Sequence, residues 1–566
     1  MGVTALPTSY YNDVIIGGTG SSNLLGNIII NGNLTINSGI TFSAINTIPT
    51  PVSYNINIKG NWTNNSGTFT AGTGTVTFDG ASAQNITGAT TFNNITLNNT
   101  PAGVIVAPGT NLTVKGNWTN SGAFNAGTAS TVTFSGASVQ SITGATTFNN
   151  ITLSNTPNGV IVASSTDITV TGNWIDTGFF NSGLGTNKII FNNTSIPQTI
   201  TSTLGVGFNI LQINSGSQVT LATNSNSYMS KQIINDGIFN GGSGTSSVFF
   251  TNLGSSISGT GVTTFNNLEI TVTASMSSST TFNIKGNFNN GAGFSNFTNT
   301  GTVTFNGVGA QTIIGATIFN NLTIANTATV VANRTLTLNS SITVSNTLTF
   351  SSGRIVLGAN NLTYNGTTPT VGSPNSYVDT STGTGSFIVG GGVTNSLFPV
   401  GNSTTYFPVM LITTVAGAKV RFGVGTGAGT TVPNSGIGSW FVFNGNDTSN
   451  KNFTIPNAIL GATLGFYNGS TWFSYPLANV SGVGSTPATY TLSSTSFGGV
   501  EQQIAIFAPV VVTFYSIVTT GPWNSPATWS NAPTGAAITA LPTTGTNTFI
   551  IQNNHTINVN NTADKC

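Results

Sequence analysis

The sequence predicts an all-β protein: a right-handed parallel β-helix (β-solenoid) with turns of about 19 residues, then an antiparallel β-sandwich, then a C-terminal β segment. Two observations predict the solenoid. Residues 57–113 are repeated almost letter for letter at 113–169, and a period of about 56 residues is typical of stacked repeats. Within a repeat, short runs that alternate an apolar residue with Thr begin about 17 to 20 residues apart. So short a turn has no room for a crossover helix, and no helical periodicity occurs, so successive turns should stack in parallel.

Aromatic residues occupy fixed positions in the repeat, and strand alternation places them on the same side as the aliphatic residues. Packing in the core therefore explains them better than exposed platforms for sugar rings. With three turns of about 19 residues, each 56-residue repeat should return to the same face of the solenoid. The first aromatic position holds Trp62, Trp118, Trp174 and Phe288, and the second holds Phe92, Phe148, Phe208, Phe265 and Phe319.

Three domains are predicted from changes in this pattern. Residues 1–366 carry the solenoid repeats. Prolines and glycines after 367 mark a boundary, and residues 367–510 show turn signals at intervals of about 10 residues, which favours a β-sandwich. Residues 511–566 begin with a different pattern, rich in Trp and Pro.

The C-terminal segment repeats the start of the chain. Ala540 to Thr543 match Ala5 to Thr8, an offset of 535 residues without gaps. The chain therefore contains one large repeat and the opening of the next. We expect this segment to associate head to tail with a neighbouring subunit, or to be part of a covalent tandem array. The residues that we assign to the contact are Trp523, Trp529, Ile550 and Ile557.

Charge is scarce. Only 4% of the 566 residues are charged and the net charge is +1, which provides no basic surface for nucleic acid or for an anionic membrane. The longest apolar run, residues 504–518, is interrupted by Pro509 and is too short to span a membrane. A single cysteine, Cys566, excludes an intramolecular disulfide.

No catalytic, cofactor or metal site is predicted. The chain has two glutamates, Glu269 and Glu501, and one histidine, His555, with no partner for acid–base or metal chemistry close in the sequence. Lys59, Lys115 and Lys285 recur at one repeat position. They are solubilising charges, or alternatively a row that binds anions.

Two binding functions remain as alternatives. Trp440 and Trp472 on the predicted sandwich are candidate contacts for a surface glycan. Outward Thr pairs are similar to the hydroxyl rows of ice-binding solenoids, although Lys188 and Ile190 interrupt them. The pairs are Thr75 with Thr77, Thr131 with Thr133 and Thr302 with Thr304.

Several phrases carry a family resemblance: the 116–122 stretch around Trp118, Gln140 to Gly144, Phe398 to Gly401, and Trp523 to Trp529. They resemble those of very large surface proteins of Bacteroidetes, whose architecture is similar to that of filamentous-haemagglutinin-type adhesins. The resemblance implies a secreted or cell-surface location. Together with the repeats, it predicts an extracellular adhesin-like structural protein, a stalk or a filament subunit, that is not an enzyme; a carbohydrate-binding or ice-binding module is the alternative.

Overall fold

The computed structural model divides the chain into two compact units, Met1–Asn320 and Asn321–Cys566. It describes residues 5–423, apart from 8, 48–49, 184, 272–275, 292–296, 368–369, 391–393 and 414–415. Between 438 and 558 it describes the backbone of eleven further strands. No helix in the described residues is long and apolar enough to cross a membrane.

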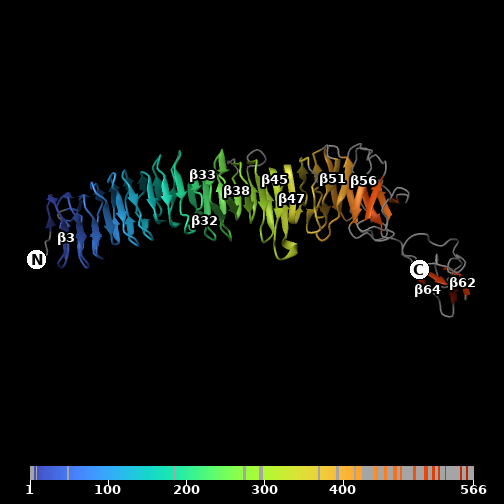
Figure 1. Cartoon of the computed structure of the whole chain (residues 1–566), viewed down its shortest axis with the longest axis horizontal. Coiled ribbons are helices and arrows are strands. Elements are labelled where there is room, and N and C mark those ends of the chain that lie inside the picture. The colour runs from blue at the N-terminus through green and yellow to red at the C-terminus, as the bar shows by residue number, and fades with distance from the viewer. Residues whose placement is uncertain are drawn as a thin grey trace. The chain divides into compact units, whose positions relative to one another are not determined.

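The first unit is a parallel β-solenoid in which most strands pair with the third one after them, which gives three strands in a turn. Where β31 (Val206–Ile213) and β33 (Asn226–Asn235) are longer, a strand pairs with the second one after it. Figure 1 shows these strands stacked across the unit. The predicted all-β, parallel solenoid is thus confirmed. The first full repeat contains β13 (Thr75–Phe78), β14 (Gln84–Thr87), β15 (Thr90–Phe92), β16 (Asn94–Leu97), β17 (Val104–Val106), β18 (Asn111–Val114), β19 (Trp118–Asn120) and β20 (Phe124–Asn125).

Successive repeats do not begin on the same face of the solenoid. It contains eight strands, β13 to β20, and a turn contains three, so a repeat covers two and two-thirds turns. The stack of β13 continues through β16 and β19, whereas the next repeat begins with β21 (Thr131–Phe134), which lies on β18. The expectation of three turns per repeat is therefore wrong. Turns also differ in length, because the step along the chain from Trp118 to its partner Ile142 is longer than the step from Thr75 to its partner Asn94.

The core is built from the inward side of every strand. Along β18 and β19 burial alternates, so Leu112, Val114 and Trp118 are buried while Thr113 is only half-buried. This two-residue alternation is the pattern that the sequence predicts for a strand with one buried face. Because each turn lies on the last, the buried side chains form one continuous column, and Trp118 packs against Phe124, Phe134 and Phe148 at ring-centroid distances of 5.0, 6.3 and 5.2 Å.

A buried glutamine recurs in this core. Gln140 Nε2 donates to the carbonyls of Val114 and Gly116 at 2.9 and 2.6 Å, and its Oε1 accepts from Gly136 N at 2.7 Å and from Asn155 Nδ2 at 2.9 Å. The glutamine side chain thus forms hydrogen bonds with backbone groups at the corner of the turn, which would otherwise be buried without a partner. Gln84, Gln198 and Gln311 occupy the same place in other repeats.

Asparagines link successive turns at the corners. Asn94 Oδ1 accepts a hydrogen bond from Asn117 N at 2.8 Å, and Asn150 Oδ1 accepts from Asn173 N at 2.8 Å. These links between turns therefore run from an asparagine side chain to a backbone nitrogen. Asn94 and Asn150 do not have left-handed backbone, whereas Gly144 does, at φ 87°.

The second unit begins as a parallel solenoid. Its described parallel strands are β46 (Thr335–Leu338), β47 (Ile342–Val356), β48 (Leu362–Tyr364), β49 (Ser376–Asp379), β50 (Phe387–Val389) and β52 (Val400–Gly401). A single-turn 3-10 helix, Val331–Asn333, precedes them. Parallel pairing therefore continues to residue 401, past the boundary that the sequence placed at 366, because 387–389 and 400–401 still stack on the preceding turns.

In the second unit, antiparallel pairing joins β54 (Ala418–Gly423) to β50 and β51 (Thr394–Phe398) to β53 (Val409–Thr413). One sheet continues from β54 and a second contains four strands, which agrees with the antiparallel strands expected here. Phe387 of the first sheet contacts Phe398 of the second, with ring centroids 5.5 Å apart. The first sheet adds β55 (Gly438–Phe443), β57 (Thr463–Tyr467), β58 (Trp472–Ser474) and β60 (Gln502–Phe507); the second contains β51 (Thr394–Phe398), β53 (Val409–Thr413), β56 (Lys451–Ile455) and β59 (Ala488–Leu492).

The C-terminal strands form a small parallel layer of their own. β64 (Thr548–Ile550) pairs in parallel with β61 (Thr513–Ser516), and β65 (Thr556–Asn558) pairs in parallel with β62 (Thr520–Pro522). β63 (Trp529–Ser530) is antiparallel to β61. The opening strands of the second large repeat therefore already lie on a preceding layer of the same chain.

Candidate functional site

All nine aromatic repeat positions lie in the core. Trp62, Trp118 and Trp174 have no exposed surface, so their faces are closed to a sugar ring. The six phenylalanines Phe92, Phe148, Phe208, Phe265, Phe288 and Phe319 are equally buried. These residues stabilise the repeat and form no binding surface.

For the other predicted contact residues that the structure describes, it gives the position of the backbone alone. Trp440 in β55 pairs with Phe422 and Ile504, and Trp472 in β58 pairs with Tyr467. Trp529, Ile550 and Ile557 lie in or against the C-terminal layer, where they pair with Ser516, Tyr515 and Gly521. Trp523, Glu501 and His555 lie outside the described residues.

The lysine row does not form, because successive repeats start on different faces. Lys59 follows β10 (Ile56–Ile58) and Lys115 follows β18, and these strands belong to different stacks. Lys285 follows β40 (Phe282–Ile284), which shares the stack of β18 but lies eight turns further on, about 38 Å at about 4.8 Å per turn. Lys59 instead approaches Asp79 at 3.7 Å.

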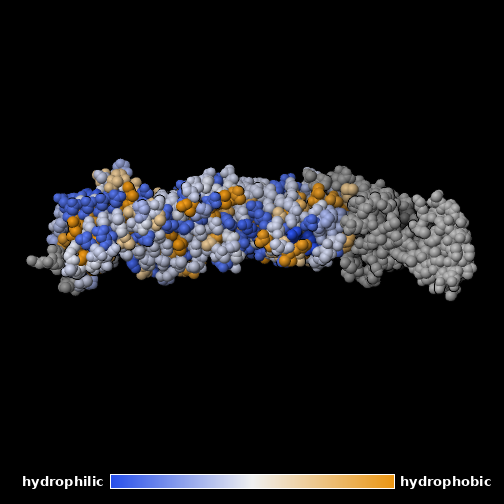
Figure 2. Space-filling view, turned by 60° about the horizontal axis from the view of Figure 1, so that its bottom comes forward, coloured by the Kyte–Doolittle hydropathy of each residue, from blue (hydrophilic) through white to orange (hydrophobic). Residues whose placement is uncertain are grey.

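The threonine pairs of successive repeats do not line up either, because successive repeats start on different faces of the solenoid. Thr77 and Thr133 lie in different stacks. The threonines that do stack come from different repeat positions: Thr77, Thr96, Thr119 and Thr143 form one column. In the column containing Thr133, Ile175 follows Thr152. Figure 2 shows a face on which hydrophobic residues form small patches among hydrophilic ones.

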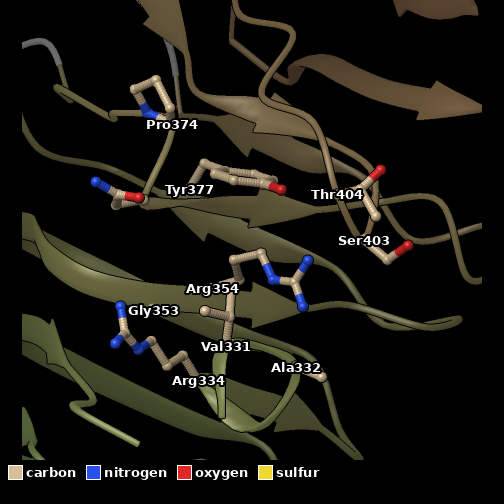
Figure 3. A pocket seen from close by; sticks show the side chains of 10 residues that line it. Val331, Ala332, Arg334, Gly353, Arg354, Pro374, Tyr377, Ser403 and Thr404 are labelled. Carbon is tan, nitrogen blue, oxygen red and sulfur yellow. The ribbon is translucent and has the colours of Figure 1, made fainter. Parts of the chain in front are cut away.

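In the part of the chain that the structure describes, no three His, Cys, Asp or Glu side chains are grouped closely enough to hold a metal ion. A cavity of about 540 Å³ lies in the second unit. Figure 3 shows it from close by. Its lining comes from four consecutive layers of the chain: Val331, Ala332 and Arg334; Gly353 and Arg354; Pro374, Asn375 and Tyr377; Ser403 and Thr404.

Arg354 is the central residue of this cavity. Its side chain is only 9% exposed, and its ζ-carbon lies 6.0 Å from the centroid of the Tyr377 ring. The two residues are direct partners in the parallel register of β47 and β49, so the fold itself stacks them. Among the described residues Arg354 forms no ion pair, and its Nε is buried without a hydrogen-bond partner. A buried cation without a counter-charge is costly, because the interior solvates charge poorly.

The ring of Tyr377 packs against the guanidinium of Arg354, and its own position is fixed by two further contacts. Its hydroxyl donates to the carbonyl of Asn402 at 2.7 Å, and its ring packs against Tyr406 with centroids 5.5 Å apart. Burial raises the pKa of the Tyr377 phenol above its ordinary value; a hydrogen bond from Arg354 and its positive charge act in the opposite direction, and the negative charge of Asp379 adds to the rise. Burial also raises the pKa of Tyr406 to about 12. Both phenols are therefore neutral at physiological pH.

The guanidinium of Arg354 points toward Ser403 and Thr404, whereas Arg334 extends the other way (Figure 3). Arg334 is fixed there because its Nε donates to the carbonyl of Ala328 at 2.6 Å. Ser403 and Thr404 are exposed on a turn that Asn402 organises: its Oδ1 accepts from the backbone nitrogens of Thr404 and Thr405 at 2.9 and 2.8 Å. The rim facing the arginine is therefore made of hydroxyl groups on an ordered turn.

The acidic residue nearest to Arg354 in the sequence, Asp379, already has hydrogen-bond partners. Asp379 lies two residues after Tyr377 on β49 and is buried, and its Oδ1 accepts hydrogen bonds from the nitrogen and hydroxyl of Ser381 at 3.0 and 2.7 Å.

Gly353 is required beside Arg354, because it has φ 91° and a Cβ there would lie 3.0 Å from the carbonyl oxygen of Arg334.

Sequence reasoning missed this site, although a signal was present. The chain has three arginines, and the spacing of Arg334 and Arg354 corresponds to one turn in a solenoid of this type. That spacing brings them to adjacent layers, where Arg354 N donates to the carbonyl of Arg334 at 2.8 Å. Tyr377 on the next layer could not be assigned, because the step from Arg354 to Tyr377 is longer than the step from Arg334 to Arg354.

No family model, no curated protein and no solved structure matches this chain.

Proposed function

We propose that this protein is an extracellular structural protein of adhesin-like architecture, a cell-surface stalk or a subunit of a head-to-tail filament, without catalytic activity. The observation that carries the proposal is the C-terminal layer. β64 and β65 lie at the offset of 535 residues from β3 (Val14–Ile16) and β4 (Ser21–Leu24), within one residue. Two strands near the start of the first large repeat thus have counterparts in the second.

The pairing of these strands supplies a way to join copies. β64 lies in parallel on β61, whereas its counterpart β3 pairs with one described strand, β6 (Leu34–Ile36). A strand like β61 from a preceding copy would fill the other edge of β3, since an open edge is a template for a further strand. Joining of this kind uses two different surfaces and gives open arrays, either between separate chains or along one tandem polypeptide.

The surface composition supports the same role. With 4% charged residues, copies repel one another weakly, and a protein whose net charge is near zero associates readily. Within the first unit, each turn of the parallel stack is hydrogen-bonded to the next, as in other stacked-repeat proteins. These are properties of a scaffold.

Negative-stain microscopy and light scattering of the purified full chain test this proposal. We expect end-to-end assemblies in the full chain and single particles in a variant that lacks residues 513–566. The variant should keep the circular dichroism spectrum of a β protein. Assemblies that persist without 513–566, or a full chain that stays monomeric at all concentrations, would refute the filament role. A polysaccharide hydrolase or lyase activity in the full chain would refute the absence of catalysis.

A further inference from the structure

We propose that the Arg354 cavity binds an acidic sugar, with the ligand's carboxylate on the guanidinium of Arg354 and its hydroxyl groups on the rim formed by Ser403, Thr404 and Asn375. The inference does not rest on the scaffold role, because the cavity lies within one unit and needs no second copy. It assigns a binding site where the sequence indicated none.

The charge of Arg354 argues for an anionic ligand. The side chain is nine-tenths buried, points into the cavity and has no ion-pair partner among the described residues. Asp379, on the neighbouring strand, is bonded to Ser381. A guanidinium presents a planar fork of N–H donors that matches a carboxylate bidentately, and such charge-assisted bonds are about twice as strong as neutral ones. A bound carboxylate would supply the missing counter-charge.

The size and lining argue for a sugar over a simple ion. A cavity of about 540 Å³ is far larger than one oxyanion and lies in the range of small-molecule sites, about 300 to 1,000 Å³. Opposite the arginine it offers the side chains of Ser403 and Thr404, and Asn375 is exposed at another edge. Hydroxyl and amide groups both donate and accept, as the hydroxyl groups of a sugar require.

The site is also held in place before a ligand arrives. Arg354 is stacked on Tyr377, Tyr377 is bonded to Asn402, and Asn402 orders the turn that carries Ser403 and Thr404. Groups that are fixed in advance lose little conformational entropy on binding.

Isothermal titration of the full chain with galacturonate, galactose and inorganic sulfate tests the proposal. We expect saturable binding of galacturonate, and binding of galactose that is weaker by about tenfold or more, because it lacks the charge-assisted bond. Arg354→Gln should weaken galacturonate binding by about tenfold or more, while Arg421→Gln, which removes an equal charge outside the cavity, should leave it unchanged.

Because Arg354 is buried, its replacement can also disturb folding, so a second variant decides in that case. Ser403→Ala changes only an exposed rim hydroxyl, and it should weaken galacturonate binding severalfold while the thermal unfolding curve stays the same. Equal affinity for galacturonate and sulfate, no saturable binding of galacturonate, or unchanged binding in both cavity variants would each overturn the assignment to an acidic sugar.

Discussion

The indole nitrogen of Trp118 donates a hydrogen bond to the hydroxyl of Thr146 across 3.2 Å, inside a core where neither residue is more than 4% exposed. Trp62 makes the same bond to Thr90 in the preceding repeat. In the third repeat the indole nitrogen of Trp174 is buried without a partner. The repeats therefore share their packing but differ in how completely their buried polar atoms are satisfied.

Replacing Trp118 by alanine should destabilise the first unit by about 3 to 5 kcal/mol, because the change empties the space between Phe124, Phe134 and Phe148. Urea unfolding followed by circular dichroism measures the loss. Trp118→Phe is the matched control, since Phe288 occupies the equivalent position naturally, and it should cost much less. An unchanged urea midpoint for Trp118→Ala would show that the indole is not in the core.

The buried glutamines allow a paired comparison. Gln140 Oε1 accepts two hydrogen bonds, whereas Gln198 Oε1 has no partner, although both amide nitrogens donate to two carbonyls of the preceding turn. Gln140→Leu should therefore destabilise the unit by about 1 to 3 kcal/mol more than Gln198→Leu, because it leaves two further buried donors unpaired. Equal losses in urea unfolding would mean that water satisfies these groups.

Asp176 makes the stability of the first unit depend on pH. Burial raises its pKa from 3.8 to about 7, partly offset by a hydrogen bond from Gly178 N. Since the folded state binds the proton more tightly than the unfolded chain, the stability from the neutral carboxyl is complete below about pH 3.8. It is lost as the pH rises to about 7 and is constant above that value.

Asp176→Asn should remove this dependence and stabilise the unit at pH 8 by up to about 4 kcal/mol. Asparagine already stands at the equivalent positions, where Asn64 and Asn120 donate to the carbonyls of Ala89 and Ala145 at 2.7 Å. The reciprocal control Asn120→Asp should introduce a similar fall in stability between pH 4 and 7. Thermal unfolding across this range measures both, and parallel curves for Asp176→Asn and the natural chain would contradict the assignment.

The strand positions and the core could be predicted from the sequence because a strand with one buried face alternates with period two, which Leu112, Thr113 and Val114 show directly. The rotation of successive repeats could not, because the repeat period fixes the order of strands but not the number of strands in a turn. Thr77 and Thr133 look equivalent in the sequence and lie on different faces. The Arg354 cavity was missed because its residues come from four layers that are unevenly spaced along the chain and share no motif.

The rotated parallel stack is the central claim, since the burial of the tryptophans and the loss of the lysine and threonine rows all follow from it. Thr96 and Thr119 are direct partners on neighbouring strands, and neighbouring strands lie about 4.8 Å apart, within reach of a disulfide. Oxidation of a Thr96→Cys, Thr119→Cys variant, with Cys566→Ser, tests the claim. We expect an intramolecular cross-link in this pair and none in Thr96→Cys with Thr152→Cys, the pair one repeat apart; a cross-link only in the second pair, or in neither, would contradict the fold.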